Sequence, residues 1–97
     1  MQSPEDAVRA TAAAIPPGRV MTYGEIGWAI GVHPRQVGRI VARIADDIPW
    51  WRVIRAGGTP ATCHDNTAPA LLAEEGVPFD GNRVDLRRLR SPDPATT

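Results

Sequence analysis

The segment RQVGRIVARIADD, residues 35–47, constrains the fold more than any other part of the sequence. Its apolar residues recur three, four and seven positions apart, which is the period of a helix face that packs against a core. They are Val37, Ile40, Val41 and Ile44. The arginines at positions 35, 39 and 43 fall four apart on a different face. We therefore expect an amphipathic helix, starting near Pro34 or Arg35, that buries one face and exposes positive charge.

A shorter helix is expected immediately before it. In TYGE, Thr22 and Glu25 have the spacing of a capping box, which satisfies free N–H groups at a helix start. The helix predicted over Tyr23–Ile30 ends at Gly31, a natural terminator, and VHP then makes a tight turn. Two short helices joined by a tight turn predict a helix-turn-helix. The arginine stripe alone is also compatible with a face that only meets solvent.

Charge is unevenly distributed, although the formal net charge is zero. Between positions 19 and 55 there are six arginines and three acidic residues, and the rest of the chain carries the compensating negative charge. An anionic partner is therefore expected to bind the central part of the chain.

The length of 97 residues allows one compact domain with one core. We assign residues 1–90 to this domain and expect residues 91–97 to form a disordered tail. No apolar run approaches the roughly 20 residues of a bilayer span, and no leader-like segment opens the chain, so we expect a cytoplasmic, nucleoid-associated protein. The single cysteine, Cys63, excludes an internal disulfide, and the sequence predicts neither a metal site nor a cofactor.

The remaining segments predict short elements. Residues 4–14 are expected to form a helix capped by Ser3. IPWWRVI, residues 48–54, is typical of a strand, and GGTPATCHDN has the composition of a loop. TAPALLAEEG predicts a helix with Thr67 as its cap and Gly76 as its end, and the DG turn in VPFDGNRVDLRRL predicts two short extended pieces that form a small hairpin or wing. The predicted fold class is an α-rich (α+β) winged helix-turn-helix domain.

Four blocks of the sequence resemble the DNA-binding domain of O6-alkylguanine-DNA alkyltransferases in order and approximate spacing. They are IPPGRVMTYGEIGWAIG, PRQVGR, IPWWRV and LLAEEG, within residues 4–77. In that family, the segment matching IPWWRV carries PCHRV, whose cysteine accepts the alkyl group. This chain has Trp50 at the position of the cysteine and Trp51 at that of the following histidine. It is therefore most similar to the alkyltransferase-like proteins, which keep the fold and the lesion pocket but lack the acceptor thiol.

The resemblance implies a non-enzymatic function. Alkyltransferase-like proteins bind O6-alkylguanine in duplex DNA by turning the nucleotide out of the helix, and they flag the lesion for nucleotide excision repair. The expected partners are double-stranded DNA containing O6-alkylguanine and nucleotide excision repair proteins, with no membrane, and the chain is expected to be a monomer. The residues independently argue against alkyl transfer, because dealkylation needs an activated thiolate and an indole is not a usable nucleophile. With no histidine to orient, Glu75 is expected to be structural.

The resemblance also assigns roles to single residues. Tyr23 matches the tyrosine that presses on the phosphate during flipping, and Arg35 matches the arginine finger that fills the vacated space in the duplex. The predicted lesion-binding residues are Tyr23, Arg35, Pro49, Trp50, Trp51 and Arg52. The predicted contacts to the DNA backbone come from Thr22, Gln36, Arg39 and Arg43. No catalytic residue is predicted, and no pocket residue is assigned after Gly58, where TPATCHDN departs from the family pattern.

Several side chains also have a purely structural interpretation. Trp50 can be core, although its position favours a pocket wall, and Trp51 is either core or a support behind the pocket. Trp28 is expected in the core, and His33 is expected to cap the helix that follows it. The basic residues near the C-terminal end are expected at the surface; they are Arg87, Arg88 and Arg90.

Two other functions remain open at this point. A winged-helix transcription regulator would use Arg35, Arg39 and Arg43 to bind undamaged DNA in the major groove. An active alkyltransferase would use Cys63, beside His64, as its acceptor. Adjacent side chains of an extended segment diverge, which argues against a catalytic pair at these two positions.

Overall fold

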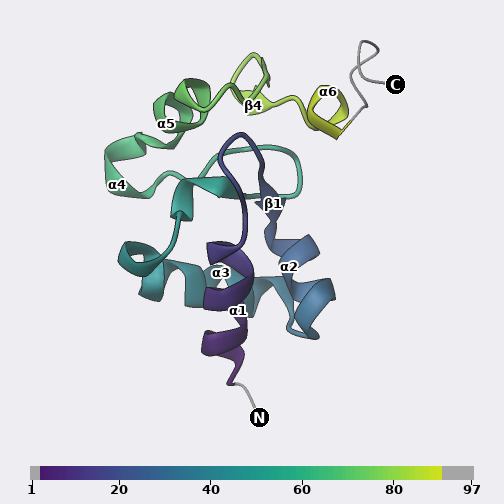
Figure 1. Ribbon diagram of the computed structural model, residues 1–97, viewed down its shortest axis with the longest axis vertical. Coiled ribbons are helices and arrows are strands. Elements are labelled where there is room, and N and C mark those ends of the chain that lie inside the picture. The colour runs from purple at the N-terminus through teal and green to yellow at the C-terminus, as the bar shows by residue number, and fades with distance from the viewer. Residues whose placement is uncertain (1–2, 91–97) are drawn as a thin grey trace.

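Three mutually packed helices form one end of the molecule (Figure 1). They are α1 (Pro4–Ala13), α2 (Tyr23–Ile30) and α3 (Pro34–Ile44). The computed structural model describes residues 3–90, so the expected tail at 91–97 lies outside the described residues. As predicted, the Ser3 side chain caps α1, and its oxygen accepts a hydrogen bond from the Asp6 N–H at 3.1 Å.

The predicted helix-turn-helix is formed by α2 and α3. The capping box is present: the Thr22 hydroxyl accepts from the Glu25 N–H at 3.0 Å, and the Thr22 N–H donates to Glu25 Oε1 at 2.9 Å. Gly31 ends α2 with φ 75°, a left-handed conformation that glycine adopts without strain. Gly27 allows the turn to fold back closely, because a Cβ there would lie 2.2 Å from the Val32 carbonyl oxygen.

The core lies between these helices and is built on the predicted inner face of α3. All four expected side chains are buried, namely Val37, Ile40, Val41 and Ile44. Ile26 contributes from α2, and Val8 contributes from α1. The expectation that Trp28 is in the core is wrong, since this residue is 90% exposed. At 100° per residue, Trp28 projects about 200° away from Ile26, so burying Ile26 directs the indole outward.

The segment 45–54 differs from the prediction, in which the preceding helix included residues 45–47 and residues 48–54 formed a strand. It forms two short 3-10 helices, η1 (Ala45–Asp47) and η2 (Trp50–Arg52), and only β2 (Val53–Ile54) is extended. β2 pairs in parallel with β1 (Met21–Thr22), which joins the segment before α2 to the segment after α3. The Arg52 N–H donates to the Pro49 carbonyl at 3.0 Å, closing a turn. A pleated strand would send consecutive indoles to opposite faces, whereas this turn packs both against the core.

Shorter elements cover the other end of the molecule (Figure 1). They are α4 (Cys63–Asn66), α5 (Ala68–Glu74), β3 (Phe79–Asp80), β4 (Arg83–Val84) and α6 (Leu86–Arg90). Their apolar residues pack in a second cluster around Leu72 and Ile54. The predicted hairpin is present as the antiparallel pair β3–β4, with Gly81 at φ 62° in its turn.

Three expectations for this part of the chain need correction. Cys63–Asn66 forms a tight turn with left-handed backbone at residues 64–66 instead of an open loop, and its His64 carbonyl accepts from both the Thr67 N–H and the Thr67 hydroxyl. Thr67 precedes α5 but makes no side-chain cap bond, because its hydroxyl is engaged with His64. The end of the hairpin segment continues into α6, where Asp85 Oδ1 accepts from the Arg88 N–H at 3.0 Å and stabilises the first turn. No helix in residues 3–90 is long and apolar enough to cross a membrane.

Candidate nucleic-acid interface

A cavity of about 140 Å³ lies between α3, η2 and the loop that follows β2. Tyr23 lines it from α2, and Gly38, Val41 and Ala42 line it from α3. Its remaining walls come from Ala45, Trp50, Arg55, Ala61 and Thr62. An apolar cavity of roughly 150 Å³ admits a single benzene-sized ring. We refer to this space as the Trp50 cavity; it is large enough to receive a flat aromatic ring.

Trp50 belongs to both the core and the cavity wall. Its side chain is only 8% exposed and packs in the main core cluster, yet it lines the Trp50 cavity. The Trp51 ring meets it edge-on, with ring centroids 5.9 Å apart and planes at 87°. The His64 ring stacks on it, with centroids 4.1 Å apart and planes at 15°. The indole is therefore fixed by neighbours on several sides while it faces an open space.

Trp51 and Arg52 converge on Glu75 instead of lining the Trp50 cavity. Trp51 Nε1 donates to Glu75 Oε2 at 3.1 Å. Arg52 donates to the same carboxylate through Nε, at 3.1 Å from Oε1, and through Nη2. Its Nη1 donates to the Ile15 carbonyl at 3.0 Å, and its guanidinium lies 5.1 Å from the centroid of the Trp51 ring. These contacts hold η2 from behind, in agreement with the structural role expected for Glu75.

Glu75 is strongly favoured in its charged form. Its hydrogen bonds from Arg52 are the main reason why the pKa of this carboxyl is lowered from 4.5 to about 2. Partial burial acts in the opposite direction, and hydrogen bonds from Trp51 and the Gly18 N–H assist the lowering. At neutral pH Glu75 is therefore a fixed anion that accepts from two separate segments of the chain, the loop at Gly18 and η2.

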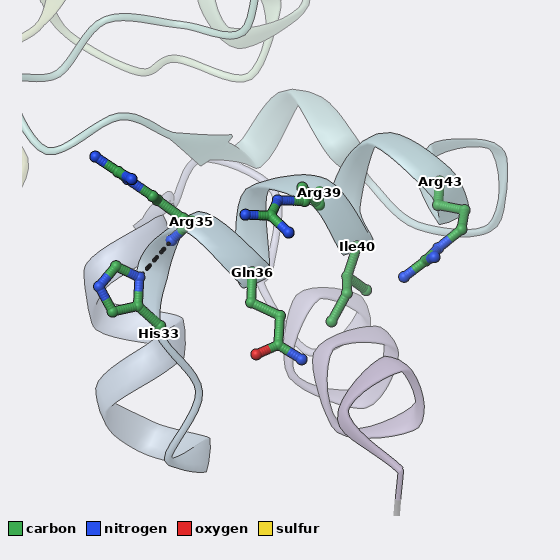
Figure 2. A pocket seen from close by; sticks show the side chains of 6 residues that line it. All are labelled: His33, Arg35, Gln36, Arg39, Ile40 and Arg43. Carbon is green, nitrogen blue, oxygen red and sulfur yellow. Dashed lines mark hydrogen bonds between the residues drawn. The ribbon is translucent and has the colours of Figure 1, made fainter.

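The exposed side of α3 carries an open groove of about 370 Å³ (Figure 2). We call it the arginine groove; it is lined by His33, Arg35, Gln36, Arg39, Ile40 and Arg43. His33 caps the helix as predicted, because its Nδ1 accepts from the Arg35 N–H at 3.1 Å. Figure 2 shows that the Arg35 side chain leaves the start of the helix and extends away from Arg39 and Arg43.

The three arginines of this groove differ in their partners. Within residues 3–90, neither Arg35 nor Arg39 forms an ion pair. Arg43 points toward α1 (Figure 2), and its Nε lies 3.4 Å from Glu5 Oε1. Two guanidinium groups are thus available to an anionic ligand, and the third must leave a carboxylate first.

One helix connects the groove and the cavity. Gly38 and Ala42 line the Trp50 cavity, while the residues that follow them, Arg39 and Arg43, line the arginine groove. A ligand that spans α3 would meet positive charge on one side and an aromatic wall on the other. This combination suits a nucleic acid, whose phosphates need cations and whose bases stack on aromatic rings.

The other predicted site residues lie close to this helix. Thr22 is 7% exposed and its hydroxyl oxygen is engaged in the capping box, while Pro49 is half-buried at the start of η2. Arg87 and Arg88 are exposed, as expected; the side chains of Cys63 and Arg90 lie outside the described part of the structure. Within residues 3–90, no group of three or more histidine, cysteine, aspartate or glutamate residues is placed to hold a metal ion.

Sequence reasoning missed the cavity wall formed by Arg55, Ala61 and Thr62. The position of Arg55 directly after a predicted strand was a usable signal, because residues at strand ends often line sites. Ala61 and Thr62 carry no such signal, since only the path of the loop brings them opposite Trp50.

The family model described as the DNA-binding domain of 6-O-methylguanine DNA methyltransferase matches residues 3–77. The chain is 35% identical over 85 residues to the DNA base-flipping protein of Escherichia coli K12; the match covers 80% of this chain and 66% of the relative. It is 32% identical over 87 residues to Alkyltransferase-like protein 1 of Schizosaccharomyces pombe, covering 81% of each. The chain thus spans just under two thirds of the length of the E. coli relative and most of the yeast one.

Two solved structures have the same fold. S. pombe Atl1 in complex with damaged DNA containing O6-carboxymethylguanine matches with a TM-score of 0.77 at 27% identity, over 96% of this chain and all of that one. S. pombe ATL in complex with DNA matches with a TM-score of 0.76 at 26% identity and the same coverage. These likenesses confirm the α-rich helix-turn-helix fold. From the family model and the identities together, the chain belongs to the family of the 6-O-methylguanine DNA methyltransferase DNA-binding domain.

Proposed function

We propose that this protein binds duplex DNA and recognises O6-alkylguanine by turning the modified nucleotide out of the helix, without removing the alkyl group. The observation that carries the proposal is the aromatic wall of the Trp50 cavity, separated from the arginine groove only by the width of α3. Relatives named for base flipping and for likeness to alkyltransferases support it, as does the fold shared with a protein bound to damaged DNA.

The energetics favour a damaged base over an intact one. Turning a nucleotide out of the stack costs a few kcal/mol, and the cost is lower for a base that pairs badly, such as O6-alkylguanine. Contact between the extruded base and an aromatic side chain returns about 1 to 3 kcal/mol. Trp50 is the side chain placed to supply this contact, and Tyr23 lines the same cavity.

The groove residues have separate roles in this proposal. Arg35, which extends from the start of α3 without an ion-pair partner in residues 3–90, fills the space left by the extruded base. The contacts to the DNA backbone come from Gln36, Arg39 and Arg43, while Thr22, which is buried and engaged in the capping box, contributes by fixing the start of α2. Pro49, Trp51 and Arg52 act on the lesion side, where the Arg52–Glu75 pair holds η2 and therefore Trp50 in position.

The absence of alkyl transfer follows from the side chains at the centre of the site. The wall residue is an indole, and the next residue donates an indole N–H to Glu75 at 3.1 Å instead of presenting an imidazole base. The complex would then persist. We propose that it acts as a monomer in the nucleoid and marks the lesion for nucleotide excision repair proteins.

The test compares two duplexes that differ only in guanine or O6-methylguanine at one position, at the same salt concentration. Fluorescence anisotropy should show tighter binding to the modified duplex, and equal affinities would instead favour a regulator that binds undamaged DNA. Intact-mass analysis after incubation should show an unmodified protein. A mass increase of one methyl group would contradict the proposal and favour transfer to Cys63, with Cys63→Ser as the control.

A further inference from the structure

His64 is the closest aromatic neighbour of Trp50. The two rings are stacked, with centroids 4.1 Å apart and planes at 15°. Trp51 is farther away and meets Trp50 by its edge. One face of the Trp50 indole is therefore covered by an imidazole, so an incoming base cannot stack on that face.

His64 also connects the two sides of the cavity. Its Nε2 lies 3.6 Å from Oδ1 of Asp46, which belongs to η1. Ala45, beside Asp46, lines the Trp50 cavity, and so does Thr62, two residues before His64. The imidazole thus lies between η1 and the loop that carries Thr62, and its contact with Asp46 is at the surface, where the Asp46 side chain is 97% exposed. The His64 side chain is 37% exposed, so solvent or DNA can reach it.

The backbone that carries this ring has an unusual conformation. His64, Asp65 and Asn66 have φ values of 56°, 56° and 59°, three consecutive residues in the left-handed region. Histidine, aspartate and asparagine adopt this region more readily than most residues with a Cβ, but usually singly. Three in succession are strained, and such strain persists only where the surrounding structure enforces it, often at functional sites. The His64 carbonyl is held by Thr67, whose hydroxyl donates to it at 2.8 Å and whose N–H donates at 3.2 Å.

We propose that His64 is a specificity-determining residue of the lesion site. Its ring fixes the orientation of the Trp50 indole and, through Asp46, sets the separation of the loop and η1 walls. A base that enters the Trp50 cavity would contact the indole, and an indole held by the stacked His64 ring resists displacement by that contact. This inference rests on the proposed function and concerns the preference for the lesion, not affinity for DNA in general.

The experiment measures the ratio of dissociation constants for the guanine duplex and the O6-methylguanine duplex. His64→Ala should lower this ratio by about 2- to 10-fold, the range expected for the loss of one aromatic pair, with little change for the guanine duplex. His64→Phe keeps a flat ring and should retain most of the wild-type ratio. His64→Leu has bulk but no ring, so its ratio should be as low as that of His64→Ala. If His64→Ala does not fold, His64→Leu takes its place in the comparison.

The Asp46 contact has a matched control in the neighbouring acid. Asp46→Asn should lower the ratio, because it removes the charge that lies against His64. Asp47→Asn also removes one negative charge from η1, but Asp47 lies against Arg9, so this variant should leave the ratio unchanged. Removal of an acid can raise affinity for all DNA, and the ratio cancels this common effect.

The outcomes separate this inference from the proposed function. A wild-type ratio of one would refute the proposed function. With a wild-type ratio above one, two results would overturn the role of His64: a wild-type or higher ratio in His64→Ala, which includes equal losses on both duplexes, or a His64→Phe variant no better than His64→Leu. Thermal unfolding of each variant confirms that the compared proteins are folded.

Discussion

At the scale of single residues, the site depends on side chains that are restrained from several directions. Trp50 is packed into the core, meets Trp51 edge-on and stacks on His64, yet it still borders a cavity. The Arg52 guanidinium donates hydrogen bonds to Glu75 and to the Ile15 carbonyl. Arg35 is the contrast, since it is exposed and, among the described residues, has no ion pair. The proposed lesion site therefore combines a fixed indole with an exposed cation.

Arg35→Ala should weaken binding to the O6-methylguanine duplex more than binding to the guanine duplex. The reason is that the guanidinium would stabilise only the state in which the nucleotide is turned out. Arg39→Ala is the matched control and should weaken binding to both duplexes by the same factor, because a phosphate contact does not depend on the lesion. Titrations of both duplexes by anisotropy check this, and equal losses for Arg35→Ala would exclude the finger role.

At the scale of elements, α2 and α3 organise the interface. The Thr22–Glu25 capping box starts α2, and the capping histidine and Pro34 start α3, so both helices begin at defined residues. α3 then separates a buried apolar face from the arginine groove, and its sides reach the Trp50 cavity. An altered helix start would move all of these surfaces together.

Thr22→Ala should lower the free energy of unfolding by about 1 kcal/mol, because it removes the hydroxyl that accepts the Glu25 N–H at the start of α2. Urea denaturation measures the change. Thr22→Ser keeps the acceptor and should retain most of the stability. Equal losses in both variants would show that the threonine methyl group, which is buried, matters more than the cap.

Arg39→Ala should reduce the slope of log binding constant against log salt concentration by about 0.9, the value expected for one lost phosphate contact on duplex DNA. Arg43→Ala should change it less, since Arg43 already lies 3.4 Å from Glu5 and must exchange one anion for another. Binding to a guanine duplex over a range of salt concentrations gives both slopes. An unchanged slope for Arg39→Ala would place this arginine away from the backbone.

At the scale of the whole molecule, the Glu75 carboxylate links parts that are distant in sequence. It accepts from the Gly18 N–H, from Trp51 and from Arg52, and Arg52 in turn donates to the Ile15 carbonyl. These bonds connect the segment after α1, which contains Ile15 and Gly18, to η2 and to the turn after α5. Protonation of one carboxyl group should therefore weaken the contact between the two core clusters.

The pH dependence of stability follows from the lowered pKa of Glu75. Because the pKa falls from 4.5 to about 2 on folding, the stabilisation is complete above about pH 4.5 and is lost as the pH falls toward 2. The loss should amount to about 1 to 2 kcal/mol after allowance for screening by solvent. Urea denaturation between pH 7 and pH 2 measures it.

Glu75→Gln isolates this contribution. It should be less stable than the wild type at pH 7, because it leaves the Arg52 guanidinium without its anion, and it should lose less stability on acidification. Glu74→Gln removes an exposed neighbouring charge and should follow the wild-type profile. Parallel profiles for wild type and Glu75→Gln would assign the acid sensitivity to other carboxylates.

Local patterns predicted the helices well because their causes are local. The capping box, Gly31 and the apolar spacing of α3 act within a few residues, so both ends of α2 and the start and buried face of α3 follow from them. Trp28 shows the limit of such reasoning: hydrophobicity alone placed it in the core, but the orientation of α2, decided by Ile26, places it in solvent. The strand predicted at residues 48–52 was wrong for a similar reason, because the observed turn packs two adjacent indoles against the core, whereas a strand would direct them to opposite faces.

The features of the site also divide into those that the sequence predicts and those that only the folded chain shows. Block order and the indole at position 50 were sufficient to predict the family, the arginine stripe and the missing thiol, because these depend on residue identity and helical period. The cavity wall at Ala61 and Thr62, the Arg52–Glu75 pair and the stacking of His64 on Trp50 required the folded chain. Each of them joins residues that are 11 or more positions apart, and such contacts are decided by chain packing, which sequence spacing does not encode.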